Sequence, residues 1–180
     1  MHALRVAVGA LWLVFWIYWL ATALGAKQST GGRRARLCGL TVAVPVFIIL
    51  RVLGGGSLAI RSPEVAGVGA ACLVAGLGLA VWARLHLGRN WGMPMSQKAD
   101  PELVTSGPYR LIRHPIYSGL LLAMVGTTLV RNLIGLAFVV AAGAFFLYSA
   151  RVEERNLAAT FPSAYPAYRS ATKMLIPFVL

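Results

Sequence analysis

Long apolar segments alternate with short polar segments along the chain. Three apolar segments, residues 4–26, 37–53 and 65–83, fill the first half. Two more, residues 118–130 and 133–150, follow a polar stretch in the second half. A membrane-spanning helix needs roughly 20 apolar residues. The pattern therefore predicts an all-α fold, a polytopic membrane helix bundle with about five transmembrane helices.

The last two apolar segments are separated only by Arg131 and Asn132. So tight a connection predicts a helical hairpin over residues 116–150, and we expect its first helix to begin near Pro115 because proline suits a first helical position. The chain is expected to form a single membrane domain. Its first part, residues 1–83, supplies three N-terminal helices. Its second part, residues 84–180, supplies a polar segment, the hairpin and an amphipathic tail, and is expected to hold the functional site.

Small residues recur at four-residue spacing in the third apolar segment, at Gly67, Ala71 and Ala75. Residues four apart lie on the same face of a helix. A stripe of small side chains lets a neighbouring membrane helix approach closely. We therefore expect this stripe to be the face on which the third helix packs.

The composition supports a membrane protein, because 58% of the residues are hydrophobic and only 12% are charged, against about 25% in soluble domains. The net charge of +12 does not indicate a nucleic-acid partner, since the cations lie in short loops rather than on one continuous face. With the N-terminus outside, thirteen lysines and arginines fall on the inner side of the membrane and four on the outer side. This bias predicts that the polar segments face the cytoplasm and contact membrane lipids there.

Cysteine and histidine do not indicate a metal centre. Cys38 and Cys72 lie in or beside apolar segments, where cysteine usually packs as a small hydrophobic residue. No two of the three histidines stand at metal-ligand spacing. We expect no metal site and no disulfide.

Two polar clusters flank the predicted hairpin. One, residues 109–117, lies at its entrance and contains His114, two arginines and two tyrosines; the other, residues 151–155, lies at its exit and contains Glu153 and Glu154. A hairpin brings its entrance and exit together, so the clusters should be neighbours. Ionisable groups at a membrane edge indicate a functional site. The motifs of serine hydrolases, P-loop ATPases and zinc proteases are absent from the sequence.

The stretch LVTSGPYRLIRHPIYSG, residues 103–119, is followed by the hairpin, by RVEE and by FPSAYPAYRSATKMLIPF. In this order the segments resemble the isoprenylcysteine carboxyl methyltransferase and phospholipid methyltransferase superfamily, over about half of the chain. The resemblance implies S-adenosylmethionine as methyl donor and S-adenosylhomocysteine as product. It also implies a cofactor pocket formed by Leu103, Val104, Tyr109, His114, Pro115, Tyr117, Glu153 and Glu154.

The resemblance further implies that one of the two glutamates holds the α-amino group of the donor. In the prenylcysteine enzymes an arginine just before the glutamates contacts the substrate carboxylate, and Arg151 is the nearest candidate for this catalytic role, although its spacing to the glutamates is shorter than in the animal enzymes. The expected acceptor is lipophilic and enters from the bilayer, most simply as an isoprenylcysteine-like carboxylate. A phospholipid amine is the next candidate, and it would need a base such as Glu154 or His114.

Two other classes of protein remain as alternatives. Sterol-type membrane reductases, which use NADPH, share a related HPxY motif. They typically carry asparagine and an acidic residue where this chain has Ile116 and Leu120. A non-catalytic membrane subunit with the same fold is the other alternative. Among single residues, Trp91, Tyr165 and Tyr168 are expected at the membrane interface and His86 in solvent.

Overall fold

The computed structural model describes residues 2–23, 59–60, 62–92, 95 and 100–176. These residues contain five α-helices, α1 (His2–Ala23), α3 (Pro63–Leu87), α4 (Pro115–Arg131), α5 (Gly135–Thr160) and α6 (Tyr165–Ala171). Two short 3-10 helices, η1 (Gly88–Asn90) and η2 (Gly107–Arg110), lie between α3 and α4. The predicted second span, residues 37–53, and Cys38 lie outside the described residues.

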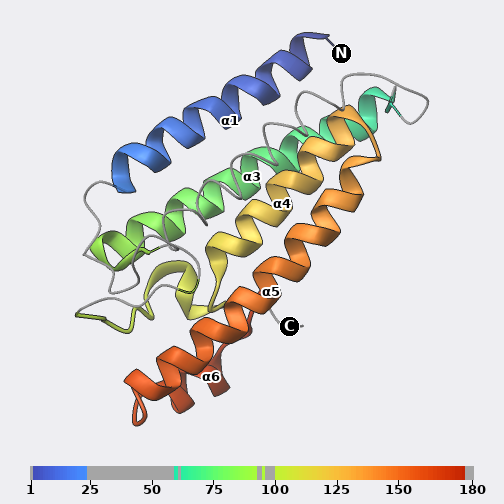
Figure 1. Ribbon diagram of the computed structural model, residues 1–180. Helices are drawn as coiled ribbons and strands as arrows, with labels where there is room; N and C mark the ends of the chain where they lie inside the picture. Colours follow the sequence, from blue (N-terminus) through green and yellow to red (C-terminus); the bar gives the residue numbers. More distant parts are fainter. Residues whose placement is uncertain (1, 24–58, 61, 93–94, 96–99, 177–180) are drawn as a thin grey trace.

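The four long helices lie side by side in the order α1, α3, α4, α5 (Figure 1). Three of them, α1, α3 and α5, are long and apolar enough to cross a membrane, whereas α4 is a shorter apolar helix of 17 residues. The described part of the chain contains no β-strand beyond two isolated bridges. The predicted all-α membrane fold is thereby confirmed.

Helices α3 and α4 pack backbone against backbone through glycines. A Cβ atom added to Gly76 would lie 2.4 Å from the backbone nitrogen of Ala123 and 2.5 Å from the carbonyl oxygen of Gly119. A Cβ atom added to Gly69 would lie 2.7 Å from the carbonyl oxygen of Gly126. Real Cβ atoms do not approach backbone so closely, so these positions admit only glycine without displacing a helix. The two glycine contacts form what we call the glycine seam.

The seam corrects the expected small-residue stripe. Gly67, Ala71 and Ala75 are exposed on α3, and nothing lies within 4 Å of a Cβ atom built on Gly67. The packed face is the neighbouring row, which includes Gly69 and Gly76. Small residues occupy two adjacent rows of this helix. Their spacing alone does not tell which row meets protein and which meets lipid, because lipid also accepts glycine and alanine.

The hairpin begins at Pro115 as predicted, and its turn is stabilised by Asn132. This side chain is fully buried, and its Oδ1 accepts a hydrogen bond from the backbone N–H of Ile134 at 2.9 Å. Helix α5 continues to Thr160 rather than ending at Ala150. The apolar pattern indicates where the lipid-facing segment ends, not where the helix ends. Because residues 151–160 contain good helix formers, they continue the same helix.

Helix α1 covers α3 and α4 with an aromatic face. Trp12, Phe15 and Trp19 are buried, and they recur at the three- and four-residue intervals of one helix face. The indole N–H of Trp12 donates a hydrogen bond to the hydroxyl of Thr127 on α4, at 2.9 Å and 115 residues away in the chain. The polar atoms of this contact satisfy each other, as buried polar groups must.

The glycine seam predicts that Gly76→Ala destabilises the bundle by about 1–3 kcal/mol, the usual cost of overpacking a tight contact. The matched control is Gly78→Ala on the same helix, where nothing lies within 4 Å of the added Cβ. Thermal unfolding of both variants in detergent measures the difference. Equal unfolding temperatures would contradict the close contact between α3 and α4.

Candidate functional site

Glu153 and Glu154 lie in the last turns of α5, beside the first residues of α4. The end of α3, the start of α4 and the end of α5 gather at one end of the bundle, as Figure 1 shows. Consecutive residues on a helix point about 100° apart. The two carboxylates therefore face different neighbours, although they are adjacent in the sequence.

Glu153 faces the start of α4 and the segment before it. Its Oε1 accepts a hydrogen bond from the Tyr117 hydroxyl at 2.5 Å and another from the backbone N–H of Met95 at 2.9 Å. Its Oε2 lies 3.3 Å from Nδ1 of His114. The side chain is nevertheless 24% exposed, so the carboxylate remains accessible from outside.

Glu154 is enclosed by basic groups. Its Oε1 lies 2.6 Å from Nε of Arg113 and 3.5 Å from Nε2 of His114, and its Oε2 lies 3.8 Å from Nε of Arg169. The contact to His114 is too long for a hydrogen bond and acts as an ion pair. The side chains of Glu154 and Arg113 are only 7% and 8% exposed. This pair is buried, whereas the Glu153 carboxylate stays partly exposed.

Arg113 also fastens the C-terminal tail to the site. Its Nη1 donates hydrogen bonds to the carbonyl oxygens of Thr172 and, at 3.2 Å, Arg169. The backbone of the same motif pairs with the tail, because the N–H of Arg113 donates to the carbonyl oxygen of Lys173 at 2.8 Å. We call the ion pair of Arg113 and Glu154, with these tail contacts, the tail clasp.

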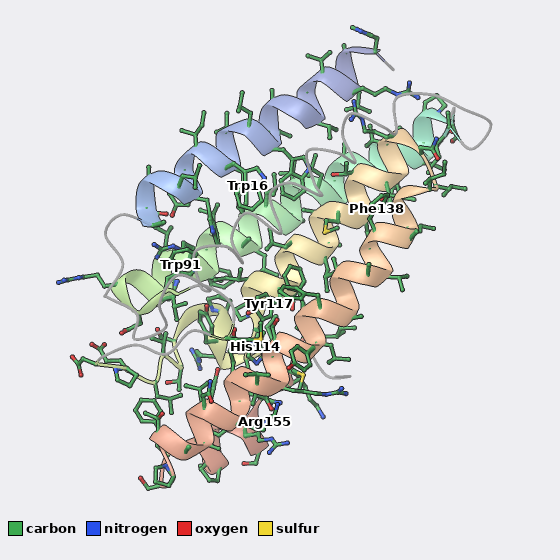
Figure 2. All side chains as sticks on the ribbon, viewed as in Figure 1. Trp16, Trp91, His114, Tyr117, Phe138 and Arg155 are labelled. Atoms are coloured by element: carbon green, nitrogen blue, oxygen red, sulfur yellow. The ribbon has the colours of Figure 1, made fainter. Side chains whose placement is uncertain are left out.

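The rings of His114, Tyr117 and Phe146 form a stack; Figure 2 labels the first two, which lie close together. The His114 and Tyr117 rings lie 5.6 Å apart between centroids, and the Tyr117 and Phe146 rings lie 4.7 Å apart, both pairs within 9° of parallel. The stack connects the polar cluster to the apolar core, to which Tyr117 and Phe146 belong. Phe146 was not predicted from the sequence. Its position two turns before Glu153 on α5, and so on the same helix face, was the available signal.

The two carboxylates set the protonation of His114. Burial alone lowers the pKa of an imidazole. Here the close contact with Glu153 and the negative charges of both carboxylates outweigh burial and raise the pKa of His114 above its ordinary value. The imidazolium form is therefore favoured between two carboxylates.

The remaining predicted pocket residues are distributed over the start of α4, η2 and the stretch before η2. Pro115 is buried at the first position of α4. Tyr109 is buried in η2, where its carbonyl oxygen accepts a hydrogen bond from the Tyr168 hydroxyl at 2.8 Å. Leu103 and Val104 are half-buried in the non-helical stretch before η2. Among the described residues no hydrogen bond or ion pair joins these two to the carboxylates, and their place in a pocket stays a prediction.

Arg151 lies outside the cluster. Its side chain is exposed on α5, and none of the ion pairs among the described residues includes it. Its predicted role toward an acceptor carboxylate remains untested. The structure instead brings Arg113 and, at a longer distance, Arg169 to Glu154. Arg113 stands next to His114 in the motif and could have been singled out for that reason.

Two expected interface residues are buried instead. Tyr165 is 1% exposed at the start of α6, and Trp91 is 7% exposed after η1. Aromatic residues in polar segments often mark an interface, but here the Trp91 ring packs against Trp19 of α1 and the guanidinium of Arg84, and Tyr165 packs against Tyr168. His86 is exposed, as expected.

The tail clasp predicts different effects for the two glutamates. Glu154→Gln leaves Arg113 buried without its counter-charge and should lower the free energy of unfolding by about 3 kcal/mol. The matched control, Glu153→Gln, keeps the clasp and should cost about 1 kcal/mol. Denaturation in detergent and limited proteolysis of the tail measure both effects. Equal losses would contradict the division of roles.

The raised pKa of His114 predicts that stability falls as the pH rises. The folded state favours the imidazolium, so its stabilising contribution is complete below the ordinary pKa of about 6.5 and disappears as the pH rises through the higher folded-state pKa. The difference in unfolding temperature between the wild type and His114→Gln should be largest near pH 6 and shrink at higher pH. A difference that grows with pH would contradict the assignment.

Comparison with known proteins shows which proteins the chain resembles. Residues 69–159 match the sequence profile of the isoprenylcysteine carboxyl methyltransferase (ICMT) family. The cobalt-zinc-cadmium resistance protein CzcN of Cupriavidus metallidurans is 34% identical over 104 residues, which are 56% of this chain and 48% of that protein. Protein-S-isoprenylcysteine O-methyltransferase B of Arabidopsis thaliana is 38% identical over 80 residues, 43% of this chain and 41% of that protein.

The chain thus spans less than half the length of these two relatives. Among solved structures, that of the eukaryotic intramembrane Ras methyltransferase ICMT shares the fold, with a TM-score of 0.57, 24% identity, and coverage of 83% of this chain and 54% of that one. The matched profile extends from the glycine seam of α3 to the end of α5 and contains both glutamates. The chain belongs to the isoprenylcysteine carboxyl methyltransferase (ICMT) family.

Proposed function

We propose that this integral membrane protein transfers a methyl group from S-adenosylmethionine to a lipophilic acceptor. The observation that carries the proposal is Glu153, a partly exposed carboxylate that lies beside the stacked rings of His114 and Tyr117. Membership of the ICMT family supports the same conclusion. Glu154, by contrast, is only 7% exposed and is enclosed by Arg113 and Arg169.

The residues of the site fit the chemical groups of the donor. An α-amino group requires a carboxylate, and Glu153 is available because Glu154 is enclosed by Arg113 and Arg169. A sulfonium is attracted to carboxylates and to aromatic rings, and Glu153 and Tyr117 lie together at this site. We therefore assign the amino group to Glu153. Leu103, Val104, Tyr109 and Pro115 remain proposed lining residues.

When bound, S-adenosylmethionine supplies an electrophilic methyl group for an in-line displacement. The protein's part is to orient the two reactants and to exclude water, since positioning supplies much of the rate of such a reaction. The tail clasp serves this purpose by holding residues 172–174 against the motif. His114 fixes the Glu153 carboxylate from one side while Tyr117 fixes it from the other.

We propose an isoprenylcysteine-like carboxylate as the acceptor class. The naming of the Arabidopsis relative as an isoprenylcysteine O-methyltransferase supports this choice. A carboxylate is already deprotonated at neutral pH, so the reaction needs no general base, and the ion pair of Glu154 with Arg113 leaves that carboxylate poorly placed to act as one. The exposed apolar faces of α1 and α5 fit a substrate that arrives through the bilayer.

We propose that the site faces the cytoplasm and that the N-terminus lies outside. The first residues of α1 lie at the opposite end of the bundle from the end of α5 (Figure 1), and the last turns of α5 carry Glu153 and Glu154. Thirteen of the lysines and arginines fall on the side assigned to the site. Cytoplasmic segments of membrane proteins carry such an excess of cations.

Calorimetric titration with S-adenosylhomocysteine tests the proposal, with NADPH titrated in parallel. We expect saturable binding of S-adenosylhomocysteine alone and a loss of about tenfold or more in affinity for Glu153→Gln, because a charge-assisted hydrogen bond is removed. Transfer of labelled methyl groups to prenylcysteine then identifies the acceptor. Binding of NADPH alone would move the protein to the reductases, and binding of neither would favour a non-catalytic subunit.

A further inference from the structure

A second buried cation, Arg84, lies in the last turn of α3 and is only 4% exposed. Its Nη1 donates a hydrogen bond to the carbonyl oxygen of Gly88 at 2.6 Å, and its Nη2 donates one to the carbonyl oxygen of Thr22 at 2.7 Å. Both oxygens belong to helix C-termini, whose dipoles favour a nearby cation. The face of the guanidinium lies 4.7 Å from the ring centroid of Trp91.

These contacts leave one edge of the guanidinium unused. An arginine side chain carries five N–H donors, and the Nε of Arg84 is buried without a hydrogen-bond partner. The hydroxyl of Tyr18, which lies within electrostatic range of Arg84, is also buried and without a partner. None of the ion pairs among the described residues involves Arg84. Two buried donors on neighbouring side chains thus have no hydrogen-bond acceptor among the described residues.

The unused edge lies close to the candidate site. η2 packs directly on the last turns of α3, because a Cβ atom on Gly107 would lie 2.3 Å from the His86 ring. Tyr109, also in η2, lies within electrostatic range of both Arg84 and Glu153. Trp91 and Tyr117 belong to the same hydrophobic core. Tyr109 is therefore a neighbour of both the buried cation and Glu153 of the proposed donor site.

The chemistry of the two donors favours one kind of ligand. The N–H groups along one edge of a guanidinium match the two oxygens of a carboxylate. A buried cation without an anion is costly, and the two helix ends offset only part of that cost. At the site itself, Arg113 is committed to Glu154 and the tail, and Arg151 is exposed. Arg84 is the buried arginine left for an anionic ligand group.

We propose that Arg84, assisted by the Tyr18 hydroxyl, binds the carboxylate of a ligand in the adjacent site. This inference rests on the proposed methyl transfer. Both reactants of that transfer carry a carboxylate, namely the donor through its amino-acid part and the acceptor through its reacting group. The shared chemistry is a carboxylate beside Tyr109, and the experiment separates the two sources.

The test compares ligand pairs that differ only in the carboxylate. One pair is S-adenosylhomocysteine and its decarboxylated analogue; the other is an S-farnesyl thioether carboxylic acid and its primary amide. Binding of each is measured by calorimetry with the full chain in detergent. In one pair the wild type should prefer the carboxylate by about tenfold or more, and Arg84→Gln should abolish that preference while the affinity for the other member changes less than about twofold.

Three further variants separate binding from folding. Arg89→Gln, which changes an exposed arginine in η1, should retain the preference. Tyr18→Phe keeps the ring and leaves the helix ends untouched, and it should weaken the preference several-fold. Arg84→Lys keeps the cation and should restore part of what Arg84→Gln loses. Circular dichroism monitors the helical content of each variant.

The outcomes are distinct. Loss of preference in the donor pair assigns the carboxylate to the donor, and loss in the acceptor pair assigns it to the acceptor. Unchanged preference in both pairs, or an equal loss of affinity for both members of each pair, would overturn the inference and leave Arg84 as a structural clamp between helix ends. Failure of the proposed function would give a different result, namely that S-adenosylhomocysteine does not bind to the wild type. In that case the farnesyl pair would still test the role of Arg84.

Discussion

The direct contact between the backbones of α3 and α4 positions nearly everything else in this protein. At Gly76 and Gly119 neither helix has a side chain, so the helices lock together with little freedom to slide or rotate. This lock fixes the first turn of α4, from which His114 and Tyr117 reach the acids of α5. It also fixes the last turns of α3, which carry Arg84. The short helix α4 has too few residues to be a secure membrane span by itself, and its packing against α3 compensates for that shortness.

The two acidic residues at the end of the bundle have different surroundings. Two adjacent glutamates on one helix necessarily point in different directions, and the structure gives each a different surrounding. Glu154 is neutralised by Arg113 and holds the tail in place, whereas Glu153 keeps an accessible carboxylate against an aromatic wall. The same buried region therefore contains one ion pair that supports the structure and one acid that is available for a ligand. Breaking a buried ion pair costs much free energy, whereas forming one stabilises a protein only modestly. Such a pair is therefore better suited to holding the tail in place than to binding a ligand.

Much of this arrangement was predictable from the sequence, and the failures have physical causes. The helical class, the hairpin from Pro115 and the meeting of its two polar ends followed from hydrophobic length and loop length. The packed face of α3 was predicted wrongly, because small residues line two rows of that helix and composition does not distinguish them. The extension of α5 to Thr160 was missed, since hydropathy reports the lipid boundary rather than the end of the helix. Trp91 and Tyr165 were expected at the interface, but segments distant in the chain cover them, and such coverage leaves no mark on the local pattern.

The pairing of residues 111–114 with residues 173–174 has a consequence for biogenesis. These two backbone segments are separated by the entire hairpin, so they can meet only after residue 174 has been synthesised. While the hairpin is being synthesised, the clasp cannot yet help it to insert, and the hairpin relies on its apolar length and on packing against α3 and α1. The polar site is completed last, on a bundle that is already assembled. The translocation machinery therefore does not encounter the site in its folded, charge-paired form.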